Sequence, residues 1–187
     1  MEIKSAKYLT SVVNANDILS DGTEFAFVGR SNVGKSSFIN SLVGQKLART
    51  SSEPGRTRMI NYFLINNSFR FVDLPGYGYH KAGKQNEKMW ESLMEEYLST
   101  STALKRVFML VDIRHDPTEL DKQMLMYLSY TGLPFTIVAT KADKIAKSKI
   151  SAYVANIAKV LKITANNIVA YSSETKINKD KILSLFE

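Results

Sequence analysis

The sequence predicts an α/β fold of three layers, in which helices cover both faces of a mainly parallel sheet. Short runs of β-branched and aromatic residues alternate with longer stretches of helical periodicity, the pattern of strands joined by crossover helices. Some runs, such as residues 107–111 and 135–139, are almost continuously apolar, as in strands buried on both faces. Asn66 and Asn67 separate two runs and predict a tight hairpin, so one pair of strands is expected to be antiparallel.

The individual elements follow from this pattern in chain order. Strands are expected at residues 24–28, 59–66, 68–73, 105–112, 133–140 and 166–171. Apolar residues at helical spacing predict helices over residues 89–98 and 154–161. Between them, Asp116 is expected to cap the start of another helix, with Pro117 as its first residue.

Length and composition limit the class of protein. A chain of 187 residues is expected to form one domain, residues 1–187, and its 44% hydrophobic and 23% charged content excludes a disordered or fibrous chain. The absence of cysteine excludes disulfides, thiol catalysis and cysteine-ligated metals. No apolar run approaches the roughly 18 residues of a membrane helix, and the opening MEIKSAKYLT lacks the apolar block of a signal peptide. We therefore expect a cytoplasmic protein.

A phosphate-binding loop is predicted directly after the strand at residues 24–28. It fits the P-loop pattern GxxxxGK[ST], between a strand and a helix, and predicts a three-layer P-loop NTPase. The matching residues are Gly29, Arg30, Ser31, Asn32, Val33, Gly34, Lys35 and Ser36. Backbone N–H groups of this loop would surround phosphate oxygens, Lys35 would reach the β- and γ-phosphates, and Ser36 would ligate Mg²⁺.

A second motif follows the strand at residues 68–73. Its residues are Asp73, Leu74, Pro75 and Gly76. A carboxylate at the end of a strand beside a P-loop can hold the water shell of Mg²⁺, and the N–H group of Gly76 could approach the γ-phosphate. An ordinary β-turn with proline at its second position is the alternative explanation, and both can hold together.

A third motif predicts recognition of guanine. Thr140, Lys141, Ala142 and Asp143 follow the strand at residues 133–140 and fit the pattern [NT]KxD. Guanine offers two adjacent donors, N1–H and the N2 amine, to one carboxylate, whereas adenine presents an acceptor at N1, so Asp143 would select guanine. The methylene groups of Lys141 could cover the base.

A weaker signal follows the strand at residues 166–171. There Tyr171, Ser172 and Ser173 could supply backbone N–H groups to the O6 atom of guanine. Glu174 departs from the SAK-like pattern that GTPases usually have in this loop.

The segments GRSNVGKS, ARTSSEPGRT (residues 48–57), DLPGYGY (73–79) and VDIRHDPTELD (111–121) resemble the EngB family, also called YihA or YsxC. The resemblance extends from about Ala6 to Phe186. It implies a Ras-like G domain of the TrmE-Era-EngA-EngB-Septin-like superfamily that hydrolyses GTP to GDP and phosphate. It also implies a switch acting in assembly of the large (50S) ribosomal subunit and in normal cell division and septation.

The resemblance also implies a first switch segment, residues 46–59, that contacts the nucleotide. The residues expected to do so are Gly55, Arg56, Thr57, Arg58 and Met59. Thr57 would join Ser36 and Asp73 at Mg²⁺. Residues 76–85 would form the second switch, and both segments would rearrange with the γ-phosphate.

Lys35, Thr57 and Asn32 are the residues expected to take part in hydrolysis. Ras-like proteins place a water-orienting Gln directly after DxxG, but Tyr77 occupies that position here, so intrinsic turnover is expected to be slow. Two explanations stay open for Asn32. It could ligate a potassium ion between the phosphates, as in related GTPases, or tolerate an unusual backbone angle in the loop.

The charge distribution suggests a partner. Residues 141–187 hold nine lysines and four acidic residues, hence +5 of the net +7, and such a surface could contact rRNA phosphates. We expect a monomer that binds GTP or GDP and the large ribosomal subunit or its precursor. The alternatives are a P-loop nucleotide or small-molecule kinase, and a GTPase acting directly at the division septum.

Overall fold

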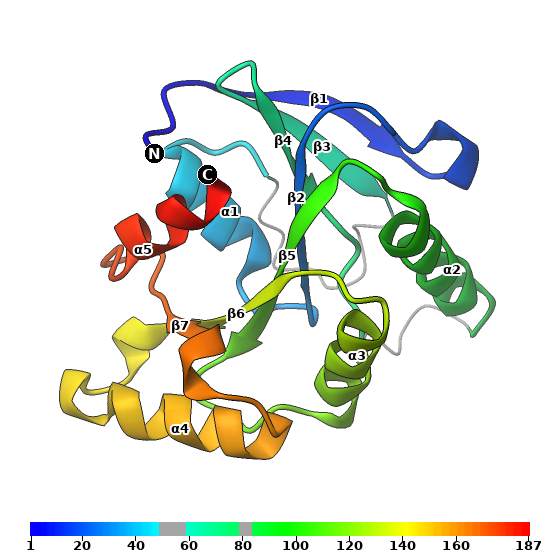
Figure 1. Ribbon diagram of the computed structural model, residues 1–187. Helices are drawn as coiled ribbons and strands as arrows, with labels where there is room; N and C mark the ends of the chain where they lie inside the picture. The colour runs from blue at the N-terminus through cyan, green and yellow to red at the C-terminus, as the bar shows by residue number, and fades with distance from the viewer. Residues whose placement is uncertain (49–58, 79–83) are drawn as a thin grey trace.

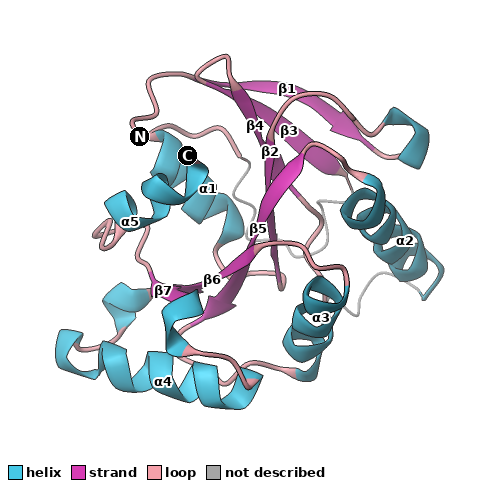
Figure 2. Cartoon of the chain, in the orientation of Figure 1, coloured by secondary structure: helices cyan, strands magenta, loops and turns pink. Residues whose placement is uncertain are grey.

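The computed structural model describes residues 1–48, 59–78 and 84–187, with only the backbone of residues 84–91. In these residues a seven-stranded sheet lies at the centre, with strand order β1-β3-β4-β2-β5-β6-β7. Helices lie on both sides of the sheet (Figure 1 and Figure 2), so the predicted three-layer α/β class is confirmed.

The expected strands are all present, and their ends differ from the predicted ones by at most two residues. The strands are β1 (Ala6–Val12), β2 (Glu24–Gly29), β3 (Ile60–Ile65), β4 (Phe69–Asp73), β5 (Leu104–Asp112), β6 (Phe135–Thr140) and β7 (Ile168–Ala170). The helices are α1 (Lys35–Val43), α2 (Lys84–Thr100), α3 (Glu119–Tyr130), α4 (Ile150–Leu161) and α5 (Lys179–Leu183).

The predicted hairpin joins β3 to β4. Asn66 and Asn67 both have φ of 51°, the left-handed conformation that a two-residue hairpin turn requires and that asparagine tolerates. The two strands are antiparallel, with Ile65 opposite Phe69 and Asn61 opposite Asp73. The hairpin prediction is therefore confirmed.

Strand β1 is an addition to the predicted elements. It pairs antiparallel with β3 at the edge of the sheet, so the sheet has a second antiparallel pair where one was expected. Only Val12 of this strand is fully buried, while Tyr8 and Leu9 are exposed. An edge strand with little burial lacks the apolar run that reveals an inner strand.

The start of α3 differs from the predicted one. The helix is capped by Thr118 rather than by Asp116. The Asp121 carboxylate accepts hydrogen bonds from the Thr118 backbone and hydroxyl, both at 2.7 Å, which completes a capping box. Asp116 instead accepts a hydrogen bond of 2.6 Å from Asn156 of α4.

The two faces of the sheet have separate cores. Side chains of α1 and α5, such as Phe38 and Ile182, pack with Phe27 and Phe108 on one face. Side chains of α2, α3 and α4 pack on the other face, where Tyr97 is fully buried. No helix in the described ranges is both long and apolar enough to cross a bilayer.

The parallel strands place all the predicted motifs at one edge of the sheet. Strand β2 runs parallel to β4 and to β5, β5 to β6, and β6 to β7. Their carboxyl ends therefore lie on the same side, where open α/β sheets bind ligands. In this register Phe27 is opposite Asp73, and Asp112 is opposite Thr140.

A buried ion pair joins β2 to β4 near the amino-terminal end of β2. Glu24 is fully buried, and its carboxylate accepts hydrogen bonds from Arg70 at 2.9 Å and from Tyr97 at 2.8 Å. Burial raises the pKa of Glu24 even though Tyr97 and Arg70 stabilise its charged form. Arg70 also contacts Asp21, whose side chain is 86% exposed.

We predict that Glu24→Ala lowers the free energy of unfolding by about 3 kcal/mol, because it leaves the buried guanidinium of Arg70 without its buried partner. Asp21→Ala removes the exposed partner of the same guanidinium and should cost under about 1 kcal/mol. Urea unfolding of the two variants measures the difference. Equal losses would show that burial of the Glu24 pair does not matter.

Candidate nucleotide-binding site

The P-loop turns between β2 and α1 with two residues in the left-handed conformation. Asn32 has φ of 64° and Gly34 has φ of 101°. At Gly29 an added Cβ would lie 2.8 Å from Val33 Cγ1, so a side chain there would force the loop open. Successive N–H groups in such a turn form a concave anion-binding surface. Asn32 does tolerate an unusual backbone angle, as the second of its two explanations predicted.

Lys35 and Asp73 meet across the site. Lys35 is the first residue of α1 and Asp73 the last of β4, and the Lys35 ammonium donates a hydrogen bond to Asp73 Oδ1. Their side chains are only 9% and 5% exposed, so each charge depends on the other for compensation. Ser36 follows in the first turn of α1, so adjoining elements supply a hydroxyl and a carboxylate, both oxygen ligands that suit Mg²⁺.

The chain after β4 lies directly against the P-loop. The Ser31 N–H donates to the Tyr77 carbonyl at 3.1 Å, and the Tyr77 N–H donates to the Gly29 carbonyl at 3.3 Å. A Cβ at Gly76 would lie 3.4 Å from both the Gly29 oxygen and the Ser31 nitrogen. Leu74 and Pro75 are buried. The DLPG motif therefore borders the predicted phosphate site through close backbone contact.

Tyr77 points away from the P-loop toward α3. Its hydroxyl donates a hydrogen bond of 2.9 Å to Oδ1 of Asp121, and the other oxygen of this carboxylate accepts from the N–H group of the capping residue Thr118. Burial and the Asp121 charge raise the pKa of Tyr77 well above its ordinary value, so the hydroxyl stays protonated and donating. The position that carries the water-orienting Gln in Ras-like proteins is thus occupied by a tyrosine whose hydroxyl is bonded to Asp121 of the capping box.

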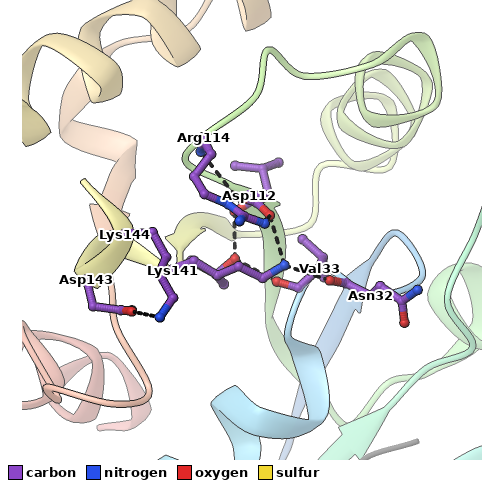
Figure 3. Close-up of polar contacts among 9 residues, drawn as sticks. Asn32, Val33, Asp112, Arg114, Lys141, Asp143 and Lys144 are labelled. Atoms are coloured by element: carbon purple, nitrogen blue, oxygen red, sulfur yellow. Dashed lines mark hydrogen bonds and ion pairs between the residues drawn. The ribbon is translucent and has the colours of Figure 1, made fainter. Parts of the chain in front are cut away.

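The base motif after β6 is tied to the P-loop by two contacts. The Thr140 hydroxyl lies 2.7 Å from the Val33 carbonyl oxygen, and the Lys141 ammonium lies 2.9 Å from the Asn32 carbonyl oxygen (Figure 3). Lys141 has φ of 61°, so its stem leaves the chain from a left-handed turn. The predicted base and phosphate motifs therefore form one continuous surface.

Asp143 is held by two neighbours. Its carboxylate accepts a hydrogen bond of 2.7 Å from the Ser172 hydroxyl and lies 3.0 Å from the Lys144 ammonium. Burial alone would raise the pKa of Asp143, but these two contacts outweigh it and hold the pKa below its ordinary value. The carboxylate therefore stays charged near neutral pH, as an acceptor of two guanine donors must.

The loop after β7 lies beside the base motif. The Ala142 N–H donates to the Tyr171 carbonyl at 3.0 Å, which joins the two loops through their backbones. Ser172 is fully buried, and its hydroxyl also accepts from the N–H groups of Glu174 and Thr175. Ser173 is half-buried. Only backbone contacts were expected of Ser172, and the contact of its hydroxyl with Asp143 was not predicted.

Part of the predicted site lies outside the described residues. This is so for Gly55, Arg56, Thr57 and Arg58 of the first switch. Met59 lies within the described residues, where it is exposed and directly precedes β3.

Two residues beside the site, Asp112 and Arg114, were not singled out from the sequence. Asp112 ends β5, and its carboxylate contacts Arg114 and Lys141. The signal that could have pointed to Asp112 was its place at the carboxyl end of a predicted strand.

Comparison with known proteins identifies the family. Residues 24–141 match the family described as 50S ribosome-binding GTPase. The probable GTP-binding protein EngB of Pelotomaculum thermopropionicum is 48% identical over 188 residues, covering 99% of this chain and 95% of the relative. The protein of the same name from Bacillus subtilis is 44% identical over 188 residues, covering 97% and 94%.

Solved structures show the same fold. The crystal structure of a probable GTP-binding protein EngB matches with a TM-score of 0.72 at 21% identity, covering 87% of this chain and 95% of the other. A crystal structure of Aquifex aeolicus Era with bound GDP and aluminium fluoride matches with a TM-score of 0.70 at 24% identity, covering 87% and 55%.

We predict that Tyr77→Phe lowers the free energy of unfolding by about 1 kcal/mol, the usual cost of one lost hydrogen bond. GTP turnover at saturating nucleotide should change less than about twofold, because the hydroxyl serves α3 and not the attacking water. Unfolding and phosphate-release assays on the same preparation test both parts. A loss of turnover of more than about tenfold would mean that the Tyr77 hydroxyl acts in hydrolysis.

Proposed function

This chain belongs to the EngB family of GTP-binding proteins, and we propose that it works as a GTP-dependent switch in assembly of the large ribosomal subunit. The observation that carries the proposal is the meeting of three motif loops at one edge of the sheet, where Lys35 contacts Asp73 and Lys141 contacts the P-loop. The family is one of GTPases, and its description as ribosome-binding supports the choice of partner.

We assign the nucleotide contacts to the motif residues. Residues 29–36 bind the phosphates, Asp143 binds guanine N1–H and the N2 amine, and residues 171–173 face O6. Lys35 exchanges its contact with Asp73 for the β- and γ-phosphates, which satisfies its buried charge equally well. Ser36, Asp73 and Thr57 would hold Mg²⁺, which supplies charge neutralisation for the phosphates when bound.

Hydrolysis by the isolated protein is slow in this proposal. Tyr77 is engaged with Asp121 and offers no amide to orient water. A monovalent cation beside Asn32 would supply part of the missing stabilisation of developing charge.

The partner surface lies in the lysine-rich last quarter of the chain. Lys159 and Lys162 lie at the carboxyl end of α4, and both are exposed. These charges would contact rRNA phosphates, so affinity for the ribosomal subunit would fall as salt rises. In this proposal the protein is cytoplasmic and residues 1–187 act as one G domain.

Asp143→Asn should abolish binding of mant-GDP and shift preference to xanthine nucleotides, because an amide can donate to the xanthine O2 atom that replaces the guanine amine. Fluorescence titration with mant-GDP, mant-XDP and mant-ATP measures the change. Asp180→Asn, the same substitution at an exposed position of α5, is the control for net charge. Unchanged preference for GDP in the Asp143 variant would contradict the assignment of the base contact.

GTP turnover should be about tenfold or more faster in potassium than in sodium buffer if the Asn32 amide ligates the cation. Asn32→Gly keeps the left-handed backbone and removes the amide, so it should retain nucleotide binding and lose the potassium effect. Parallel phosphate-release assays in the two buffers provide the measurement. Equal wild-type rates in potassium and sodium would exclude the cation role.

Co-sedimentation with large ribosomal subunits should be stronger with a non-hydrolysable GTP analogue than with GDP, since the γ-phosphate orders the switch segments. Binding should weaken steeply with salt because phosphate contacts release counterions. Ultracentrifugation at two salt concentrations with each nucleotide measures both effects. Equal co-sedimentation in the two nucleotide states would contradict the switch.

A further inference from the structure

Lys141 is held in a conformation that its backbone does not favour. Its φ of 61° is in the left-handed region, where a lysine costs about 1 kcal/mol or more. Its ammonium is fixed at the far end by the Asn32 carbonyl oxygen at 2.9 Å and by Asp112 Oδ2 at 2.9 Å. The stem is therefore stretched between the turn after β6 and the P-loop (Figure 3).

Asp112 is itself held in place by Arg114. The guanidinium donates to Oδ1 at 2.9 Å through Nε and to Oδ2 at 2.7 Å through Nη2, and the Arg114 backbone N–H donates to Oδ1 at 3.1 Å. A two-pronged contact of this kind fixes the plane of a carboxylate. With the Lys141 ammonium included, four hydrogen-bond donors face the Asp112 carboxylate, two at each oxygen.

The charge of Asp112 is essential to this arrangement. Burial alone would raise its pKa, but the hydrogen bonds from Arg114 and Lys141 outweigh burial and hold the pKa far below its ordinary value. All four partners are donors, and Asn at this position would turn an N–H₂ group toward Lys141 or toward Arg114. An amide of nearly equal size therefore cannot replace the carboxylate.

We propose that Asp112 is a positioning residue for the guanine base, acting through Lys141. It draws the ammonium to the P-loop side and so holds the methylene stem over the place where the base would lie. This inference rests on the proposed base site formed by Lys141 and Asp143. Its effect concerns affinity for every guanine nucleotide, whereas the choice of guanine over xanthine belongs to Asp143.

Asp112 and Arg114 also border a pocket of about 240 Å³ beside the P-loop. Lys141 also lines this pocket, and an ion pair that is partly open to water is weak by itself. The two-pronged contact with Arg114 holds the Asp112 carboxylate in place. Because β5 and β6 pair with Asp112 opposite Thr140, this carboxylate lies directly beside Lys141.

A double-mutant cycle on the full chain tests the proposal. Asp112→Asn should weaken mant-GDP and mant-GTP binding by the same factor, about tenfold, while preference for GDP over XDP stays unchanged. In a Lys141→Met background, which keeps most of the stem and removes the ammonium, Asp112→Asn should change affinity less than about twofold.

Asp116→Asn is the matched control, an exposed acid of the same loop whose bond to Asn156 an amide oxygen can still accept. It should bind mant-GDP as wild type does. Equal loss on Asp112→Asn in the wild-type and Lys141→Met backgrounds would overturn the proposal, as would no loss in either. Failure of the wild-type protein itself to bind mant-GDP would instead contradict the proposed function.

Discussion

Four parallel strands end side by side at one edge of the sheet, and this common direction is the constraint on which the candidate site depends. Strand β2 leads into the P-loop, β4 ends at Asp73, β5 at Asp112 and β6 at Thr140. Reversing any one of them would move its charged or hydroxyl side chain to the opposite edge. The apolar faces that bury the sheet therefore also determine where the polar chemistry lies.

The charges at this edge compensate one another across loops that are distant in sequence. Lys35 contacts Asp73, Lys141 contacts Asp112, and Asp143 accepts from Ser172. Each contact joins two different motif loops or strand ends, so none of these groups is buried without a partner. Phosphate, magnesium and guanine are each suited to take over one side of such a contact. The described part of the candidate site thus has its charged groups compensated without a nucleotide, which would reduce the cost of ordering them when one binds.

Local sequence patterns predicted most of this arrangement, because inner strands, the P-loop and the hairpin at Asn66 are specified by neighbouring residues. The missed features depend on the tertiary fold. Strand β1 is an exposed edge strand, and Thr118 caps α3 in place of Asp116 because Asp121, its capping partner, is buried against Tyr77. The proposed role of Asp112 depends on the register between β5 and β6, which the sequence does not show.

We expect these loops to form a single guanine-nucleotide site, and a crystal structure with GDP and Mg²⁺ would show whether they do. In that structure residues 29–36 should enclose the phosphates, and the Lys35 ammonium should have moved from Asp73 to the β-phosphate. The base should lie between the Lys141 stem and Asp143. GDP bound at another surface, or phosphates bound outside the loop while Lys35 still contacts Asp73, would contradict this expectation.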